Sequence, residues 1–379
     1  MFEKTKQFLD SYLEMGVPGF DLAVYKNGEC ILRYMNGYAD LENKIRHTGK
    51  ERYNIYSCSK VITCTAALQL WEKGLFSLDD KLSDYMPEFE NIKVRTNEGI
   101  VKPNSPILVK QLFEMSAGFS YDIPAPSIIK CQKETNGVCQ TREFMKYYAE
   151  DPLYFHPGDF WAYSLCHDVL AAFVEVVSGE KFETYVKKNI FDVVGMNDST
   201  FMLPKEELET IAPQYRFENG KAVNVGKDIV TYKFGSEYAS GGAGCISTVD
   251  DYVKFLEGLR KGILLKPETV EFMRTDRLND KTRREYWLKE THGYGLGVRC
   301  PKGEKPKGEF GWGGAASAFL SLDLEEDLTV YFGCHLLSSP ANGLRIFIPR
   351  FIKAELLGTE DFEQIKKEIA AVTDYNYTF

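Results

Sequence analysis

The stretch that decides the fold of this chain is Tyr53-Asn54-Ile55-Tyr56-Ser57-Cys58-Ser59-Lys60, followed by the apolar run VITCTAALQLWEK at 61–73. The first four residues favour a strand, and the apolar run favours a helix. Ser57 and Lys60 stand one turn apart at the start of that helix, so their side chains share a face. A helix N-terminus supplies free N–H groups and partial positive charge, which favour a developing anion. This arrangement can make Ser57 nucleophilic without a histidine.

The Ser-x-x-Lys motif occurs three times, and the second and third copies start at Ser127 and Ser178. We expect the Ser127 copy to lie in an irregular stretch, and the Ser178 copy at a helix end with Gly179 near the C-cap. Only the first copy is followed by a long apolar helix, which selects Ser57 as the candidate nucleophile. The structural alternative is that Ser57 is a helix N-cap and Lys60 a solvated residue of the first turn.

Length and charge narrow the classes of protein to consider. The chain has 379 residues, 44% hydrophobic and 27% charged, which is typical of a soluble globular protein with two lobes. A net charge of -9 argues against nucleic acid and anionic membranes as partners. No apolar run approaches the roughly 18 residues that a membrane span requires. We therefore expect a small-molecule substrate, and the oligomeric state stays open.

The nine cysteines and five histidines give little sign of a metal site or a disulfide framework. The cysteines are odd in number and scattered, and none forms a Cys-x-x-Cys pair. Residues 1–6 lead into a mixed-charge amphipathic segment, unlike a secretion signal. We expect buried free thiols in a reducing cytoplasm, and neither a metal nor a cofactor.

Strand patterns lie near both ends of the chain. Residues 20–26 and 29–35 flank Asn27-Gly28, which is a strong signal for a two-residue hairpin. Such a hairpin makes the sheet antiparallel. Three further strands are predicted near the other end, at 294–299, 318–323 and 328–335.

Helical and loop-rich patterns fill the middle of the chain and bracket its ends, at 2–15 and 343–357. We therefore predict an α+β fold in which an antiparallel sheet is flanked by helices and both chain ends build the sheet. The expected organisation is a single catalytic domain at 1–379, with a sheet lobe from 1–77 and 240–379 and a mainly helical inserted lobe at 78–239.

Three further segments offer groups that could complete a site. Pro157-Gly158-Asp159-Phe160-Trp161-Ala162-Tyr163-Ser164 opens a helix and brings a tyrosine near its start. The glycine-rich segment 241–248 precedes a predicted helix at 249–259. Phe310-Gly311-Trp312-Gly313-Gly314-Ala315 enters a strand whose glycines let the backbone approach a ligand closely.

In this order the motifs resemble the class C β-lactamase superfamily, which is related to penicillin-binding proteins, and within it the esterases called family VIII. The resemblance covers residues 17–357. It implies the β-lactamase/transpeptidase fold, with Ser57 as the acylated nucleophile, Lys60 as its neighbouring amine, and Tyr163 as the first residue of the Tyr-x-Asn element.

The resemblance also implies that Trp312-Gly313-Gly314 occupies the place of the Lys-Thr-Gly element. The oxyanion hole would then be the backbone N–H groups of Ser57 and Ala315. Two departures matter: Leu165 stands in place of the asparagine, and Trp312 in place of the lysine that helps hold the substrate carboxylate. Losing an amide and a cation should weaken binding of an anionic lactam. A cation such as Arg299 in the cleft would weaken this inference.

Several residues have a purely structural alternative. Tyr163 could be a core tyrosine, and His156 and His167 are expected to be hydrogen-bonding bystanders. A possible aromatic acyl or alcohol pocket, or simply a filled lobe interface, is formed by Trp312, Tyr56, Phe119 and Tyr121. No Gly-x-Ser-x-Gly elbow occurs, which argues against a Ser-His-Asp hydrolase.

The sequence therefore predicts a serine hydrolase that forms an acyl-enzyme on small esters, as a carboxylesterase or acyltransferase. Lys60 and Tyr163 would share removal of the Ser57 proton, and which of them is the formal base stays open. One alternative is amide hydrolysis by a β-lactamase or D-amino-acid peptidase. Another is a non-catalytic binding protein on the same scaffold.

Overall fold

The computed structural model describes residues 1–123, 125–228, 231–303 and 308–372. Within these residues the largest sheet has eight strands, and every neighbouring pair is antiparallel. Its strand order is β10 (Gly293–Tyr294), β11 (Arg299–Cys300), β12 (Phe310–Gly313), β13 (Phe319–Asp323), β14 (Leu328–Gly333), β1 (Gly19–Lys26), β2 (Glu29–Asp40) and β3 (Ile45–Arg46).

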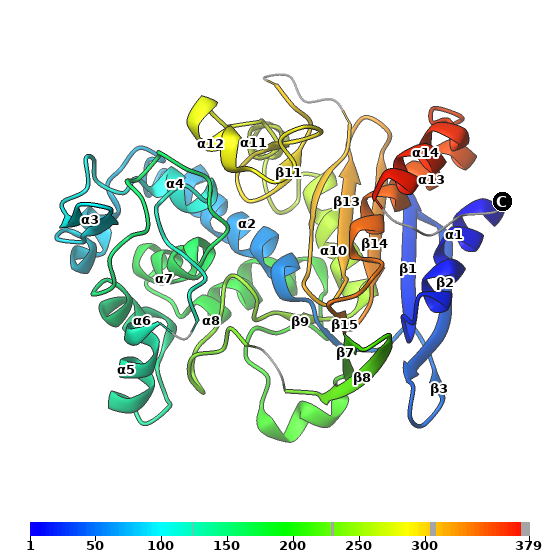
Figure 1. The fold of residues 1–379 in the computed structure, drawn as a ribbon, viewed down its shortest axis with the longest axis horizontal. Helices are drawn as coiled ribbons and strands as arrows, with labels where there is room; N and C mark the ends of the chain where they lie inside the picture. Colours follow the sequence, from blue (N-terminus) through cyan, green and yellow to red (C-terminus); the bar gives the residue numbers. More distant parts are fainter. Residues whose placement is uncertain (124, 229–230, 304–307, 373–379) are drawn as a thin grey trace.

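The predicted hairpin and the joining of the two chain ends are both confirmed. β1 turns into β2 through Asn27-Gly28, where both residues adopt the positive φ that this turn requires. On its other side β1 pairs with β14, which lies about 300 residues later in the chain. The predicted α+β class with an antiparallel sheet flanked by helices is therefore correct (Figure 1).

Helices cover both faces of the central strands, and the side chains of β1 alternate between them. Leu22 points into a core shared with α1 (Glu3–Glu14), α13 (Ile348–Leu356) and α14 (Phe362–Val372). Ala23 points into the opposite core, on the side of α10 (Val249–Arg260), where Tyr252 stacks on Tyr331 of β14. This alternation follows from the two-residue period of a strand. Figure 1 shows α1, α13 and α14 together at the outer side of the sheet.

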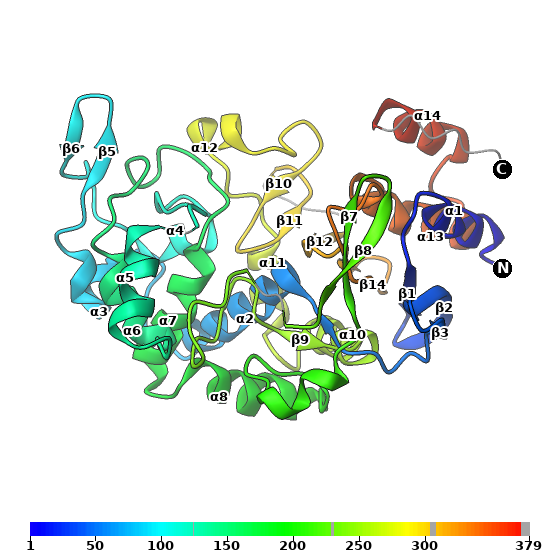
Figure 2. The ribbon, with the colours of Figure 1, turned by 60° about the horizontal axis from the view of Figure 1, so that its bottom comes forward.

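The central helix α2 (Ser59–Glu72) runs from the sheet into the helical part of the molecule (Figures 1 and 2). Its side chains from Ser59 to Leu68 are all buried, as expected for a helix enclosed on every side. It packs against α7 (Cys166–Ser178), which ends at Gly179 with φ of +73°, as predicted for the third Ser-x-x-Lys copy.

The remaining helices and strands are short. They are β4 (Tyr53–Asn54), α3 (Leu82–Tyr85), β5 (Val94–Thr96), β6 (Gly99–Val101), α4 (Val109–Phe113), α5 (Pro126–Glu134), α6 (Thr141–Tyr148), α8 (Phe182–Val186), α9 (Asp192–Val194), β7 (Gln214–Glu218), β8 (Lys221–Gly226), β9 (Ile246–Ser247), α11 (Pro267–Met273), α12 (Asp280–Glu285) and β15 (Leu336–Leu337). Short 3₁₀ turns include η1 (Tyr56–Cys58) and η5 (Asn342–Phe347).

Two local predictions are wrong. Residues 294–299 do not form one strand, because Gly297 takes φ of +83° and the backbone turns back from β10 into β11. The second Ser-x-x-Lys copy is not irregular, since Pro126 occupies the first turn of α5, where its missing N–H costs nothing. Its Ser127 hydroxyl donates to Asp151.

The expectation of free thiols is wrong for one pair of cysteines. Cys131 and Cys139 form a disulfide that closes the connection between α5 and α6. Six of the other cysteines are buried free thiols, as predicted, and Cys30 is exposed. No helix in the described ranges is both long and apolar enough to cross a membrane.

Candidate active site

Ser57 lies in η1, the single turn between β4 and α2. The turn is anchored from behind, because β4 pairs with β9 and the Ile55 N–H donates to the Cys245 carbonyl at 3.1 Å. Tyr56 adopts φ of +47°, a left-handed conformation that costs a bulky residue roughly 1–3 kcal/mol. This strained turn leaves the Ser57 side chain half-buried at the wall of a pocket.

Lys60 is fully buried directly behind Ser57. Its Nζ donates to Ser57 Oγ at 3.2 Å, to the hydroxyl of Tyr121 at 2.8 Å and to the carbonyl of Gly242 at 2.7 Å. Three acceptors match the three N–H donors of an ammonium group. The predicted contact between Ser57 and Lys60 is thus present, and the alternative of a solvated Lys60 is wrong.

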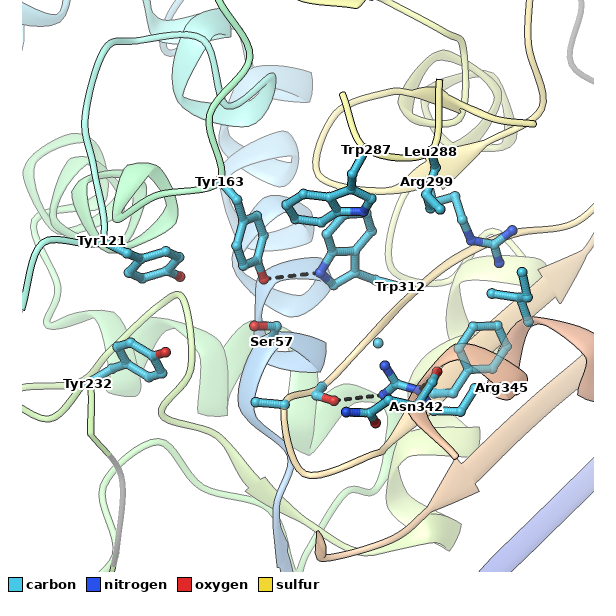
Figure 3. A pocket seen from close by; sticks show the side chains of 15 residues that line it. Ser57, Tyr121, Tyr163, Tyr232, Trp287, Leu288, Arg299, Trp312, Asn342 and Arg345 are labelled. Carbon is cyan, nitrogen blue, oxygen red and sulfur yellow. Dashed lines mark hydrogen bonds between the residues drawn. The ribbon is translucent and has the colours of Figure 1, made fainter. Parts of the chain in front are cut away.

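Tyr163 reaches the same pocket from the loop that precedes α7, and not from the helix itself. Its hydroxyl accepts a hydrogen bond from Nε1 of Trp312 at 3.2 Å, and its ring lies 4.6 Å from Nζ of Lys60. Figure 3 shows the Tyr163 hydroxyl pointing towards Ser57. In the described residues, no hydrogen bond joins Tyr163 to Ser57 or Lys60, so its expected part in the proton path stays a prediction.

Tyr121 lines the pocket, as the sequence suggested, but its contact with Lys60 was not predicted. It was predicted only as a possible aromatic wall, yet its hydroxyl contacts Lys60 directly. Burial raises the pKa of this phenol well above its usual value, and the neighbouring Tyr163 adds to that effect. Tyr121 therefore stays a neutral hydroxyl near neutral pH, able to accept from Lys60 and to donate onwards. Its spacing from Ser57 carries no local signal.

The pocket has a volume of about 290 Å³ and is open to solvent on one side. Six aromatic residues line it, and Figure 3 shows Asn342 and Arg345 across the pocket from Tyr121 and Tyr232. Its lining residues are Ser57, Tyr121, Tyr163, Tyr232, Trp287, Leu288, Arg299, Trp312, Gly313, Gly314, Ala315, Phe319, Asn342, Arg345 and Ile346. The exposed ring of Trp287 lies at 5.2 Å from that of Tyr163. Sequence reasoning missed Trp287, Tyr232, Asn342 and Arg345.

The end of β12 brings Trp312, Gly313, Gly314 and Ala315 to the pocket, as the resemblance implied. A Cβ on Gly314 would overlap the carbonyl oxygen of Ile55, so only glycine lets β12 approach the turn that carries Ser57 so closely. Ala315 is exposed at the pocket wall. The backbone N–H groups of Ser57 and Ala315 therefore come from two segments in direct contact.

The expected pocket role of three residues is corrected. Leu165 is buried in the hydrophobic core at the start of α7. Tyr56 packs in a buried cluster with Ala243 and Ala316, and its hydroxyl donates to Gln214 at 2.8 Å. Phe119 packs between the rings of Phe89 and Tyr148. The side chains of all three are used in packing, and none of them lines the Ser57 pocket.

Two guanidinium groups line the pocket, and a cation there counts against the expected weak binding of an anionic lactam. Arg299 is held by both oxygens of the Glu309 carboxylate, at 2.5 and 2.8 Å, so its charge is largely compensated. Arg345 donates from Nη1 to the carbonyls of Gly314 and Ala318, both at 2.7 Å. Within the described residues, Arg345 has no carboxylate at ion-pair distance.

Neither His167 nor His156 lines the Ser57 pocket, and their expected role as bystanders stays a prediction. His167 is fully buried on α7, and burial together with the nearby Lys60 lowers its pKa to about 3. His156 lies at the surface side of the loop, where Nδ1 accepts from the N–H of Asn104. Within the described ranges, no group of three or more histidine, cysteine, aspartate or glutamate residues is arranged to hold a metal ion.

A family model named Beta-lactamase matches residues 5–345. The chain belongs to the Beta-lactamase family. Its resemblance to the serine β-lactamase and penicillin-binding-protein superfamily is thereby confirmed, and so is the fold expected from it.

Curated relatives carry several kinds of name. The chain is 34% identical over 231 residues to lovastatin esterase of Penicillium rubens, and the match covers 57% of this chain and 57% of the esterase. It is 29% identical to the putative penicillin-binding protein PbpX of Bacillus subtilis, over 71% of this chain and 62% of PbpX. Among solved structures, EstCE1, described as a hydrolase with promiscuous acyltransferase activity, has a TM-score of 0.75. That match covers 93% of this chain and 97% of EstCE1, and its identity of 22% shows likeness of fold alone.

Proposed function

We propose that this chain is a serine hydrolase that forms an acyl-enzyme on Ser57 and acts on small esters. The observation that carries the proposal is the contact of Lys60 Nζ with Ser57 Oγ, at 3.2 Å, at the wall of an open pocket. A nucleophile and a base within hydrogen-bond reach are the basic requirement of covalent catalysis. Hydrolase and acyltransferase names among the relatives support the same chemistry.

The proposed reaction has two steps. The Ser57 hydroxyl attacks the ester carbonyl while its proton passes to Tyr163 or to Lys60, which accepts it in the neutral amine form, and the oxyanion is held by the N–H groups of Ser57 and Ala315. The alcohol then leaves with that proton. Water, or a second alcohol, then attacks the acyl-enzyme. The same base takes its proton and returns it to Ser57, which is released when the acid or the new ester forms.

Ester cleavage is preferred over lactam cleavage because Trp312 stands where the related β-lactamases carry a lysine. An indole offers no point charge to a substrate carboxylate, and burial beside it removes hydration. Arg345 favours the second candidate, hydrolysis of an anionic amide by a β-lactamase or D-amino-acid peptidase, since its guanidinium lacks a carboxylate partner in the described residues. Arg345 could thus replace the missing lysine in holding a substrate carboxylate.

A cytoplasmic location stays a prediction. The scattered cysteines favour it, whereas the Cys131–Cys139 disulfide counts against it, because disulfides are uncommon in reducing compartments.

The nucleophile is tested by intact-mass labelling with a fluorophosphonate, followed by peptide mapping. We expect the adduct on Ser57, and Ser57→Ala should abolish both labelling and esterase activity while the thermal midpoint stays within a few degrees. Ser127→Ala and Ser178→Ala are matched controls, because both remove the serine of a Ser-x-x-Lys motif away from the pocket. An adduct on Ser127 or Ser178 would refute the proposal.

The substrate class is tested with short p-nitrophenyl esters, a penicillin and a cephalosporin in parallel. We expect ester turnover well above cephalosporin turnover and weak or absent penicillin hydrolysis. Arg345→Met should affect carboxylate-bearing esters more than neutral esters with the same acyl group. Efficient penicillin turnover with negligible esterase activity would favour the second candidate.

A further inference from the structure

A buried carboxylate lies behind the proposed catalytic lysine, and the mechanism above does not use it. Asp168 is in the first turn of α7 and has no exposed surface. Its Oδ1 accepts hydrogen bonds from the hydroxyls of Ser240 at 2.6 Å and Tyr238 at 3.0 Å. Its Oδ2 has no side-chain partner in the described part of the chain and faces the backbone of Gly242, whose hydrogen bond opposes the rise in the carboxyl pKa that burial causes. A half-satisfied buried carboxylate is costly unless an opposite charge is near.

This oxygen lies on the side of Lys60. Both groups lie next to the position where Gly242 lacks a side chain: a Cβ on this glycine would overlap Oδ2 of Asp168 and would stand 3.3 Å from Nζ of Lys60. The Gly242 carbonyl in turn accepts from Lys60. A glycine at this position therefore allows a carboxylate and an amine to approach each other without a direct hydrogen bond.

Lys60 needs such a counter-charge because everything it touches is neutral. Its three acceptors are two hydroxyls and a carbonyl, and the side chain is fully buried. The other titratable groups that face Lys60 or Asp168 from neighbouring elements are Cys58, Cys64, Tyr121, Tyr148, Tyr163, Cys166, His167, Tyr232 and Tyr238. Burial raises the pKa of the cysteines, Tyr121, Tyr148, Tyr232 and Tyr238 and lowers that of His167. Burial also raises the pKa of Asp168, and the hydrogen bond from Ser240 and the charge of Lys60 oppose that rise. Asp168 is the one carboxyl group in this set.

We propose that Asp168 is a positioning residue that supplies the counter-charge of Lys60 across Gly242, and so sets the pH range in which Lys60 can exchange a proton with Ser57. This inference rests on the proposed function, since it assigns Lys60 a part in proton transfer. A direct ion pair would hold Lys60 as an ammonium group. In the described residues no hydrogen bond joins Asp168 to Lys60, so the attraction is weaker than in a direct ion pair: the charge is stabilised and the proton can still move.

The test is the pH profile of kcat/KM for a short ester, compared between the wild type and Asp168→Asn. The amide keeps an oxygen for Ser240 and Tyr238 and removes the negative charge. The ammonium form of Lys60 then loses stabilisation. The limb of the profile in which activity rises as Lys60 loses its proton should therefore move to lower pH by about one unit or more. Glu175→Gln is the matched control, because it neutralises another largely buried acid on α7, near the far end of the helix, and should leave the limb in place.

A purely structural role predicts a lower kcat or a lower thermal midpoint with an unshifted profile, and that result would overturn the inference. If Asp168→Asn does not fold, Ser240→Ala decides. Removing the Ser240 hydroxyl makes the Asp168 carboxylate easier to protonate. The Lys60 limb of the pH profile should therefore again move to lower pH, by a smaller amount than in Asp168→Asn. An unshifted limb in Ser240→Ala would then count against the inference.

A readout independent of turnover separates this inference from the proposed function. In protein carrying 13C at the lysine ε-carbons, the Lys60 resonance is assigned by its loss in Lys60→Met, and its titration midpoint should fall in Asp168→Asn. If the Lys60 midpoint shifts but Ser57 is not labelled, the role of Asp168 is supported and the proposed nucleophile is refuted. If Ser57 is labelled but the midpoint does not shift, the nucleophile is supported and the role of Asp168 is refuted.

Discussion

At the level of single side chains, Lys60 is held by one neighbouring acceptor and by two acceptors from distant parts of the chain. Ser57 is one turn away, Tyr121 comes from a loop of the helical part, and Gly242 from the segment before α10. This convergence fixes the amine at the nucleophile and limits its rotation. Loss of any one acceptor should therefore widen the range of positions that the Lys60 amine can adopt.

Tyr121→Phe should lower kcat for ester hydrolysis by about tenfold or more. The substitution leaves the ring in the pocket wall but removes the hydroxyl that Lys60 contacts at 2.8 Å, leaving one N–H of a buried amine without its partner. The measurement is steady-state kinetics with a short ester, together with the rate of fluorophosphonate labelling. Tyr232→Phe is the control, since Tyr232 lines the same pocket and its ring stacks near Tyr121 at 5.2 Å. Equal activity of the two variants would show that the Tyr121 hydroxyl has no part in catalysis.

At the level of elements, the close approach of β12 to η1 builds the candidate oxyanion hole. Gly314 allows this approach, and Arg345 from η5 fastens the turn that follows through the carbonyls of Gly314 and Ala318. Three elements from separate parts of the sequence therefore set the position of the Ala315 N–H.

Gly314→Ala should reduce both activity and stability. Its Cβ would overlap the Ile55 carbonyl, so β12 or η1 has to shift, at a cost of about 1–3 kcal/mol. Labelling of Ser57 should slow together with a drop in the thermal midpoint. Gly343→Ala is the matched control, because nothing lies within 4 Å of the Cβ that it adds in η5. A Gly314→Ala variant with the wild-type labelling rate would show that this contact does not position the oxyanion donors.

For the molecule as a whole, buried titratable groups make stability depend on pH in opposite directions. Burial lowers the pKa of His335 to about 4, so this group favours the folded state above 6.5, and the contribution is lost as the pH falls towards 4. Burial raises the pKa of Asp21 and of Glu114 to about 7. The folded state binds these protons more tightly than the unfolded chain does, so both carboxyl groups stabilise the folded protein as the pH falls. The net slope of the wild type therefore hides each contribution.

A variant isolates the histidine. His335→Gln should be less stable than the wild type at pH 7, and the difference should shrink by about 3 kcal/mol between pH 7 and pH 4. The reason is that the neutral glutamine binds no proton in either state, whereas His335 in the unfolded chain does. Urea unfolding at a series of pH values measures this difference. A stability gap that stays constant with pH would show that His335 titrates normally in the folded protein.

The sequence by itself determined the features that local patterns encode. Asn27-Gly28 specified the first hairpin, because few residues tolerate two consecutive positive φ values. The apolar run after Ser57 specified a buried helix and placed Lys60 one turn beyond the nucleophile candidate. The glycines after Trp312 indicated a close backbone approach, and the structure shows that approach at Gly314.

Only the tertiary structure decided which distant groups meet at Ser57. Tyr121, Gly242 and Arg345 lie between 61 and 288 residues from Ser57 or Lys60 in the sequence, and no periodicity links such positions. The same holds for the corrected residues: Leu165 and Phe119 are apolar enough to line either a pocket or a core, and only the packing of the folded chain decides between the two. Local spacing fixes which side chains share one helix or strand, whereas packing of separate segments fixes which of them share one cavity.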